Sequence, residues 1–356
     1  MTLTFDLDPL LVVRIAAMVF AVLTLGAVLD LTLGTRLRNR AHRRRHAGVR
    51  QAFDAVVSLT DPATDPAQVA QQLRELPDRV VEEALTVTAR SLAGRDRDRF
   101  REVADHVGVH DRARAQLRSR RWWRRLRAVR VLRMTSAQAP VLELFDDEEP
   151  EIRAAAALWV GSLLESGEAL PAAGGRWAAT SSPATEAADR LADGLLDPAA
   201  LVRLATKHAV GRGGAVPVDA VERALTRCLA DPDRPSLLPV APLAAAAALG
   251  TAVDPQLVTP FLDDHDARVR AAAVRADAAV QPERVAELCD RFVVDDQVVR
   301  EAVAAVAGRD LASAHHLVGL SADDAWQVRQ IARRSLGRLG PVGRALLRRV
   351  QREAAA

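Results

Sequence analysis

The chain has 356 residues, of which 49% are apolar, and its net charge at pH 7 is +3. A chain of this length and hydrophobicity can bury a large core, which excludes an intrinsically disordered protein. Aromatic residues make up only 3%, tyrosine is absent, and alanine, leucine and valine dominate. Small apolar side chains let helices approach closely, so this composition favours stacked helices over a β-sandwich or a β-barrel.

The positive charge is concentrated in two short windows. Residues 34–53 contain seven arginines and residues 112–133 contain ten, and neither window contains an acidic residue. Together the windows carry +17, which leaves −14 for the rest of the chain. This distribution is typical of a mildly acidic protein with two basic surfaces that meet an anionic partner.

The first predicted element is an apolar segment at 10–33, LLVVRIAAMVFAVLTLGAVLDLTL. As a helix it would be about 36 Å long, enough to cross a hydrocarbon core of about 30 Å. Arg14 and Asp30 lie near opposite ends, where their side chains can reach the interfaces. A cleaved signal peptide, a buried core helix and an interfacial helix are the alternatives. The acidic start, the uniform apolarity and the lack of a strongly polar face favour a transmembrane helix.

The arginines that follow this segment determine its predicted orientation. They are Arg36, Arg38, Arg40, Arg43, Arg44, Arg45 and Arg50. By the positive-inside rule, the basic juxtamembrane segment 34–50 lies in the cytoplasm and the short tail 1–9 lies outside the plasma membrane. The same cluster is expected to attract anionic lipid headgroups, with about 1 kcal/mol for each basic residue near the surface.

The rest of the chain shows helical periodicity interrupted by short turns, with no convincing strand. Helix start and stop residues, such as the proline and glycine that enclose 77–94, predict a small helical adaptor over 51–118. A repeated pattern then runs through 119–356: an apolar residue, an arginine, a pair of small residues, and a glycine eight residues after the arginine. A stretch rich in glycine, serine and proline at 169–187 is expected to be a loop insertion.

The arginine of this pattern recurs about every thirty residues, the length of two short helices with their turns. The matching arginines are Arg153, Arg203, Arg270, Arg300 and Arg329. Arg124 also fits the register after Trp123, and Pro242 takes the position of the arginine in the unit that ends at Gly250. The period predicts a solenoid of about six to seven helix pairs after the transmembrane helix.

Acidic residues precede the arginine in most of these units. They can cap the following helix, whose first amide groups otherwise lack partners. The arginine lies one turn into that helix and is expected to pair with an acid of a neighbouring unit. Repeated along the chain, this contact would make a structural ladder of Arg153, Arg203, Arg270, Arg300 and Arg329.

Two segments match a known repeat well, IRAAAALWVG at 152–161 and VRQIARRSLG at 328–337. Their pattern, D-x-x-V-R-x-x-A-A-x-A-L-G, resembles the short bacterial form of the HEAT repeat, also seen in phycobilin-lyase-like proteins. The resemblance covers about 120–340, with departures at Lys207 and Pro242. The order of anchor, basic segment, adaptor and repeats is similar to a group of bacterial membrane-anchored HEAT-repeat proteins. This similarity implies a scaffold that accompanies a membrane glycosyltransferase of cell-envelope polysaccharide synthesis.

No catalytic or cofactor-binding pattern is present in the sequence. It contains no G-x-G-x-x-G on a strand, no P-loop, no H-E-x-x-H and no G-x-S-x-G. The adjacent His315 and His316 are predicted to be a solvated pair, because two neighbouring side chains rarely face one ion. Cys228 and Cys289 lie in apolar helical contexts and are expected to be buried packing residues. The sequence therefore predicts no enzyme, no cofactor, no metal and no small-molecule substrate.

The leading candidate for partner binding is an arginine- and tryptophan-rich segment near the start of the repeats. It consists of Arg120, Arg121, Trp122, Trp123, Arg124 and Arg125. Arginine interleaved with tryptophan suits an anionic or aromatic ligand. The alternative assigns both tryptophans, with Leu126, Val129 and Leu132, to the core face of the first repeat.

These features together predict a membrane-tethered scaffold that binds a membrane-associated protein partner. The alternative function is nucleic-acid binding through the arginines of 112–133. It is disfavoured because the first basic window is already explained by membrane topology. A phycobilin-type lyase is a third alternative; it would need a pigment partner, and a shared fold does not imply a shared function.

Overall fold

The computed structural model describes residues 46–89, 95–135, 137, 139–167, 170, 182–212, 215–231 and 233–353. The regular elements in these ranges are helices, and none of these residues lies in a β-strand. The all-α prediction is therefore confirmed for the described part of the chain. The residues group into two units, Met1–Ala113 with Met134–Ala137, and Arg114–Arg133 with Gln138–Ala356. The boundary predicted from sequence, after residue 118, lies a few residues further along the chain.

The predicted transmembrane helix at 10–33, the tail at 1–9 and most of the basic segment 34–50 lie outside the described residues. Within the described part, which begins with helical residues 46–57, no helix is both long enough and apolar enough to cross a membrane. The anchor, its orientation and its lipid contacts therefore stay predictions.

The first unit is a cluster of short helices. They are residues 46–57, the 3-10 helix η1 (Ser58–Thr60), α2 (Pro66–Arg74), α3 (Asp78–Thr88), α4 (Arg95–His106) and the first part of α5 (Val109–Leu117). Asp65 caps α2 by accepting a hydrogen bond from the Ala67 amide. Pro66 fits the first helical position because the amide hydrogen that it lacks would have no partner there.

Arg99 of α4 holds the turn between η1 and α2 in place. Its guanidinium donates to the carbonyl oxygens of Leu59, Asp61 and Thr64. These three contacts hold the turn against α4 by hydrogen bonds as well as by apolar packing. In the same unit, the buried His110 binds the Thr135 hydroxyl through Nε2 at 2.8 Å.

The second unit contains the remaining helices. They are α6 (Trp122–Met134), η3 (Val141–Asp146), α7 (Pro150–Ser166), α8 (Pro183–Leu195), α9 (Ala200–Val210), α10 (Ala215–Ala230), α11 (Val240–Leu249), η4 (Gly250–Ala252), η5 (Pro255–Leu257), η6 (Thr259–Asp263), α12 (Ala267–Val280), η7 (Pro282–Arg284), α13 (Val285–Phe292), α14 (Gln297–Val306), η8 (Ala307–Arg309), α15 (Ala314–Leu320), α16 (Trp326–Arg338) and α17 (Gly340–Glu353).

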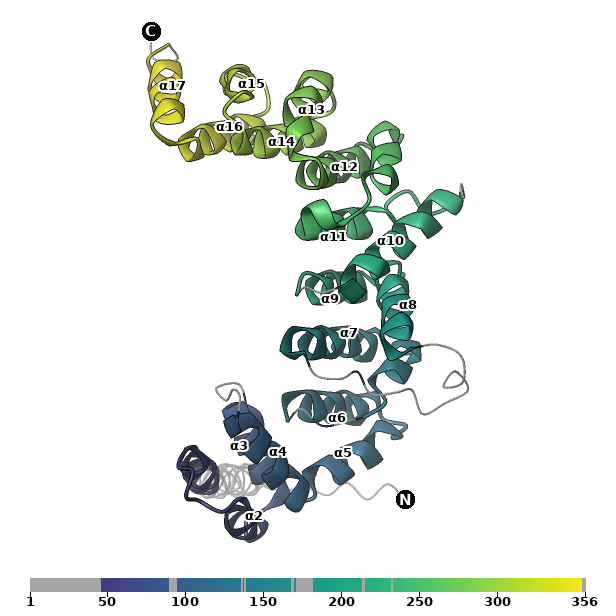
Figure 1. Cartoon of the computed structure of the whole chain (residues 1–356), viewed down its shortest axis with the longest axis vertical. Coiled ribbons are helices and arrows are strands. Elements are labelled where there is room, and N and C mark those ends of the chain that lie inside the picture. The colour runs from purple at the N-terminus through teal and green to yellow at the C-terminus, as the bar shows by residue number, and fades with distance from the viewer. Residues whose placement is uncertain are drawn as a thin grey trace, which may run out of the picture. The chain divides into compact units, whose positions relative to one another are not determined.

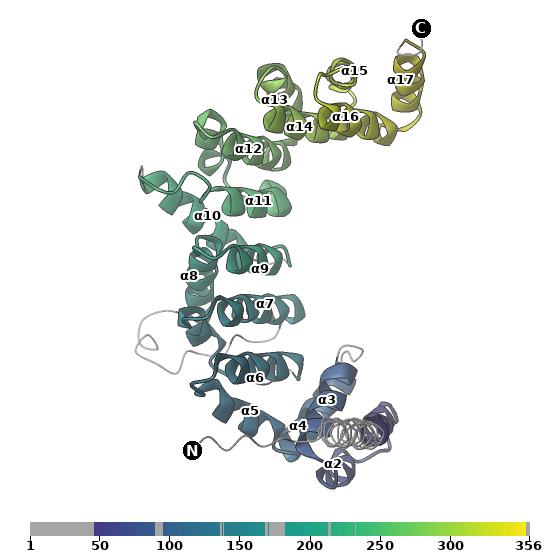
Figure 2. The ribbon, with the colours of Figure 1, turned by 180° about the vertical axis from the view of Figure 1, so that it is seen from behind.

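Six of these helices form a row in which each packs against the next: α7, α9, α11, α12, α14 and α16. Figures 1 and 2 show α7, α9 and α11 side by side from opposite directions. Each helix of the row also packs against a neighbour outside it, such as η3 on α7, α10 on α11, η6 on α12 and α15 on α16. Cys228 and Cys289 are buried, as expected, in α10 and α13.

Small residues make close packing within the row possible. A Cβ atom on Gly161 of α7 would lie 2.7 Å from the Cα of Ala209 in α9, and one on Gly308 would lie 2.7 Å from the Cβ of Ser335 in α16. Both glycines occur eight residues after the arginine of their unit. In these two units, the glycine of the repeat lies where the next helix of the row approaches closely.

The predicted loop at 169–187 is wrong at its C-terminal end. Residues 183–187 begin α8, because Ser182 Oγ accepts a hydrogen bond from the Thr185 amide and Pro183 occupies the first helical position. Residues 168–169 and 171–181 lie outside the described part. The preceding helix α7 ends at Ser166 and is capped by Gly167, whose φ of +67° is a left-handed conformation that favours glycine.

Candidate partner-binding surfaces

An arginine–aspartate ladder links successive parts of the second unit. Arg153 Nε donates to Asp197 Oδ2 at 2.7 Å, and its Nη2 donates to Oδ1 at 3.0 Å. This two-point geometry matches the planar guanidinium to the carboxylate. The equivalent pairs are Arg125 with Asp147, Arg270 with Asp295, and Arg300 with Asp323.

Each aspartate of the ladder holds two arginines, one through its side chain and one through its backbone. Asp323 accepts from Arg300 through its carboxylate, while its carbonyl oxygen accepts from Arg329 Nη1. Its Oδ1 also accepts the Ala325 amide at 2.8 Å. The side chains of Arg300 and Asp323 are only 18% and 8% exposed, so water screens this pair weakly.

The acid dependence of stability should report on the ladder. The hydrogen bonds from Arg300 lower the pKa of Asp323 from 3.8 to about 2, and those from Arg270 lower the pKa of Asp295. A carboxylate with a lowered pKa stabilises the fold fully above its ordinary pKa and loses that contribution as the pH falls through the lowered value. We expect the urea midpoint to fall between about pH 4 and pH 2. The fall should be shallower in Arg300→Gln, and an equal fall in both proteins would contradict this origin.

The structure corrects the register at the first ladder position. Arg125, and not Arg124, binds Asp147, with Nε and Nη2 each 2.9 Å from a carboxylate oxygen. The other ladder arginines in the row follow a buried apolar residue, and Trp123 before Arg124 imitates that pattern in the sequence. Trp123 is nevertheless 47% exposed, while Arg125 is buried. Arg125 is therefore part of the ladder and does not belong to an exposed binding segment.

The other five residues of the predicted arginine–tryptophan segment are exposed at the start of α6. Trp122 is 44% exposed, and the Arg124 guanidinium lies 5.1 Å from the centre of the Trp123 ring. Assigning both tryptophans to the core face is therefore wrong. Leu126, Val129 and Leu132 do belong to the core. The segment presents a small cation–π surface to solvent.

The ladder is interrupted after α9. In the regular units the accepting aspartate lies five or six residues before the arginine of its own unit, and in the α11 unit that place is taken by Ser236. Arg203 donates to the carbonyl oxygens of Asp197 and Pro198 at 2.7 and 2.8 Å. It has no carboxylate partner among the described residues, so its charge is uncompensated at the surface of the row.

The same unit also lacks its own arginine, because Pro242 takes that place in the first turn of α11, where proline is tolerated. Arg234, in the turn before α11, replaces it. Its Nη2 donates to Asp264 Oδ2 at 2.8 Å, and its guanidinium lies 5.4 Å from the Phe261 ring centre. The stack is thus joined past the interruption by a residue outside the repeat pattern.

A groove of about 330 Å³ opens at the interruption. It is lined by apolar residues of α9, α11 and the preceding turn, and by three cations: Leu204, Leu237, Val240, Ala241, Ala244, Arg203, Lys207 and Arg268. Leu204 is 65% exposed, although the equivalent residues of α7 and α12 are buried alanines. The exposed Leu204 side chain therefore adds to the apolar lining of the groove.

The charge around the groove is positive. Arg268 is neutralised by Asp266, whose carboxylate accepts from Nη2 at 2.9 Å and from Nε at 3.2 Å. The side-chain ammonium of Lys207, the only lysine of the chain, makes no ion pair or hydrogen bond within the described part. Lys207 and Arg203 therefore leave two positive charges next to the apolar lining. We name this set the α9–α11 groove.

Sequence reasoning did not find the α9–α11 groove, although signals for it exist. Lys207 and Pro242 were recognised only as departures from the repeat. Leu204 replaces the small residue that follows the arginine in the α7 and α12 units. These departures cluster in the two consecutive units where the ladder is interrupted.

No family model matches the sequence, and no curated protein matches it. Among solved structures, the chain is similar to the crystal structure of an engineered protein, with 15% identity and a TM-score of 0.33. The similarity covers 81% of this chain and 88% of that protein.

Proposed function

We propose that the chain is a membrane-tethered, HEAT-like solenoid that acts as a scaffold and binds a membrane-associated protein partner through the α9–α11 groove. The apolar segment 10–33 and the arginines after it support the tether, with the second unit in the cytoplasm. The repeated arginine–aspartate contacts and the glycine positions support a solenoid. Resemblance to membrane-anchored HEAT-repeat proteins suggests a membrane glycosyltransferase as partner.

The observation that carries this proposal is the combination of an exposed leucine and two uncompensated cations at the interruption of the ladder. The apolar lining can accept one or two apolar side chains, while Arg203 and Lys207 attract carboxylates. The partner segment should therefore be amphipathic and acidic, with its apolar anchors seated beside Leu204. An amphipathic helix meets both requirements because its apolar and acidic residues lie on adjacent faces.

Lys207 allows a direct test, because a carbodiimide reagent joins a lysine amine to a carboxylate that touches it. The full-length protein is solubilised from its native membranes with the partner bound, cross-linked, and analysed by mass spectrometry. We expect a peptide in which Lys207 is joined to an aspartate or glutamate of a membrane protein. Leu204→Asp should weaken binding of that protein about 30-fold, the effect of losing an interface hot spot.

Leu311→Asp is the matched control, because Leu311 is also an exposed leucine, 53% accessible, but lies outside the groove. The α9–α11 groove is not the binding site if Leu204→Asp and Leu311→Asp bind the partner equally well. The same conclusion follows if the partner is cross-linked only to residues other than Lys207. Recovery of no membrane protein would reject the tethered scaffold. Salt-sensitive binding of labelled DNA or RNA that depends on Arg120 and Arg121 would favour the nucleic-acid alternative.

A further inference from the structure

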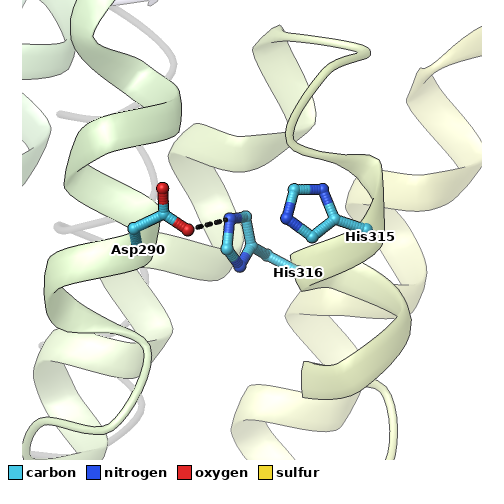
Figure 3. Close-up of side chains that lie close together, drawn as sticks. All are labelled: Asp290, His315 and His316. Carbon is cyan, nitrogen blue, oxygen red and sulfur yellow. Dashed lines mark ion pairs between the residues drawn. The ribbon is translucent and has the colours of Figure 1, made fainter.

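Three potential metal ligands meet between α13 and α15. Asp290 lies on α13, and His315 and His316 lie in the first turn of α15, as Figure 3 shows. The His316 Nε2 atom is 3.1 Å from Asp290 Oδ1, and the two imidazole centres are 3.8 Å apart. One ligand atom from each residue can be chosen so that all three lie within 4.8 Å of one another. The prediction of a solvated histidine pair is therefore wrong for His316, whose side chain is only 10% exposed.

The His316 ring lies in a largely buried position, with its Nε2 atom beside the Asp290 carboxylate. Its Nε2 is buried and makes no well-aligned hydrogen bond within the described structure, although Asp290 is close. A buried ring nitrogen beside a carboxylate, without a good hydrogen bond, needs an explanation, and an ion between them supplies one.

The tautomer of His315 is also suited to metal binding. Its Nδ1 lies 2.9 Å from the carbonyl oxygen of Ala312. A carbonyl can only accept, so Nδ1 carries the proton and Nε2 keeps its lone pair. Figure 3 shows that this second nitrogen faces His316. A backbone carbonyl that orients the far nitrogen is the usual outer contact of a metal-binding histidine.

We propose that Asp290, His315 and His316 bind one divalent transition-metal ion, such as Zn²⁺, Ni²⁺ or Co²⁺. Two imidazoles and one carboxylate suit these ions better than Mg²⁺ or Ca²⁺, which prefer oxygen ligands. Bonds of about 2.0–2.2 Å place the ligands of a tetrahedral ion about 3.4 Å apart. Rotation of the side chains that moves the ligand atoms by about 1 Å therefore gives this spacing, and a water molecule would be the fourth ligand. The ion would join α13 to α15 across neighbouring helix pairs of the second unit.

The test measures Zn²⁺ and Co²⁺ binding to the metal-free full-length protein. We expect one equivalent of Co²⁺ to give the visible absorption of a nitrogen- and oxygen-ligated ion, and Zn²⁺ to displace it. Zn²⁺ should raise the thermal unfolding midpoint, because it binds the folded state only. His315→Gln and Asp290→Asn, both at exposed positions, should each weaken binding by more than tenfold.

His265→Gln is the matched control. His265 is 81% exposed and lies 3.2 Å from Asp264, so it forms a histidine–aspartate pair without a third ligand. This variant should bind the metal as the wild-type protein does. The proposal is overturned if no saturable site of one equivalent appears, or if His315→Gln and Asp290→Asn bind as tightly as His265→Gln. The unfolding midpoint of each metal-free variant shows that it is folded.

Discussion

Replacing Arg300 with glutamine should lower the free energy of unfolding by about 3 kcal/mol. The substitution removes the cation from an ion pair that is largely shielded from water and leaves the Asp323 carboxylate without its partner. Most of this loss in stability comes from burying the unpaired Asp323 carboxylate, because an intact buried ion pair contributes little net stability. Urea unfolding followed by circular dichroism measures the effect.

Arg329→Gln is the control for this prediction. Arg329 holds the same position in the next unit and donates to the carbonyl oxygens of Asp323 and Asp324, but it has no carboxylate partner in the described part of the chain. Its replacement removes only backbone hydrogen bonds, and about 1 kcal/mol is expected. Similar losses in both variants would show that the carboxylate contact contributes little and that the backbone contacts dominate.

The ladder shows how far the sequence could predict this structure. A conserved spacing within one chain places an arginine and an acid at fixed points of successive helices, so their pairing follows from helix geometry and stacking. The predicted ladder contacts are confirmed for Arg153, Arg270 and Arg300. The prediction is wrong for Arg203 and Arg329, which donate to carbonyl oxygens and have no carboxylate partner among the described residues. It failed at α6, because the sequence there offers two adjacent arginines, and the choice of Arg125 depends on which side of the helix is buried.

The prediction that the acids cap the following helices was right in only some units. Asp266 caps α12 by accepting the Arg268 amide, whereas Asp323 accepts the amide of the cap residue Ala325 itself. The arginine of the neighbouring unit draws the carboxylate toward the ladder in the second case. A local pattern could not show this competition, because the competing group is more than twenty residues away.

Neither candidate site was predicted, although Leu204, Lys207 and Pro242 depart from the repeat pattern beside the α9–α11 groove. At the α9–α11 groove, Ser236 and Pro242 occupy the positions of a ladder pair. The lack of a carboxylate partner for Arg203 appears only once the helices are stacked. Asp290 lies far from His315 and His316 in the chain, and only the packing of successive helices brings the three together. Tertiary proximity of this kind has no signature in the spacing of a single sequence.

Replacing Gly161 with alanine should destabilise the protein by about 2–3 kcal/mol, although alanine is ordinarily the better helix former. The new Cβ would lie 2.7 Å from both the Cα and the Cβ of Ala209. Backbone atoms cannot rotate away, so α7 and α9 must move apart and lose packing along their contact. Urea unfolding again gives the change, and hydrogen exchange in α7 and α9 should increase locally.

Gly337→Ala separates this packing effect from helix propensity. Gly337 has the same place in its repeat unit, eight residues after Arg329, but a Cβ there would meet no atom within 4 Å. Here alanine should stabilise the protein by up to about 1 kcal/mol, because it reduces the freedom of the unfolded chain. Opposite signs at the two glycines would show that the repeat keeps glycine for the approach of the next helix. If both substitutions change the stability in the same direction, the glycine affects only the helix that contains it.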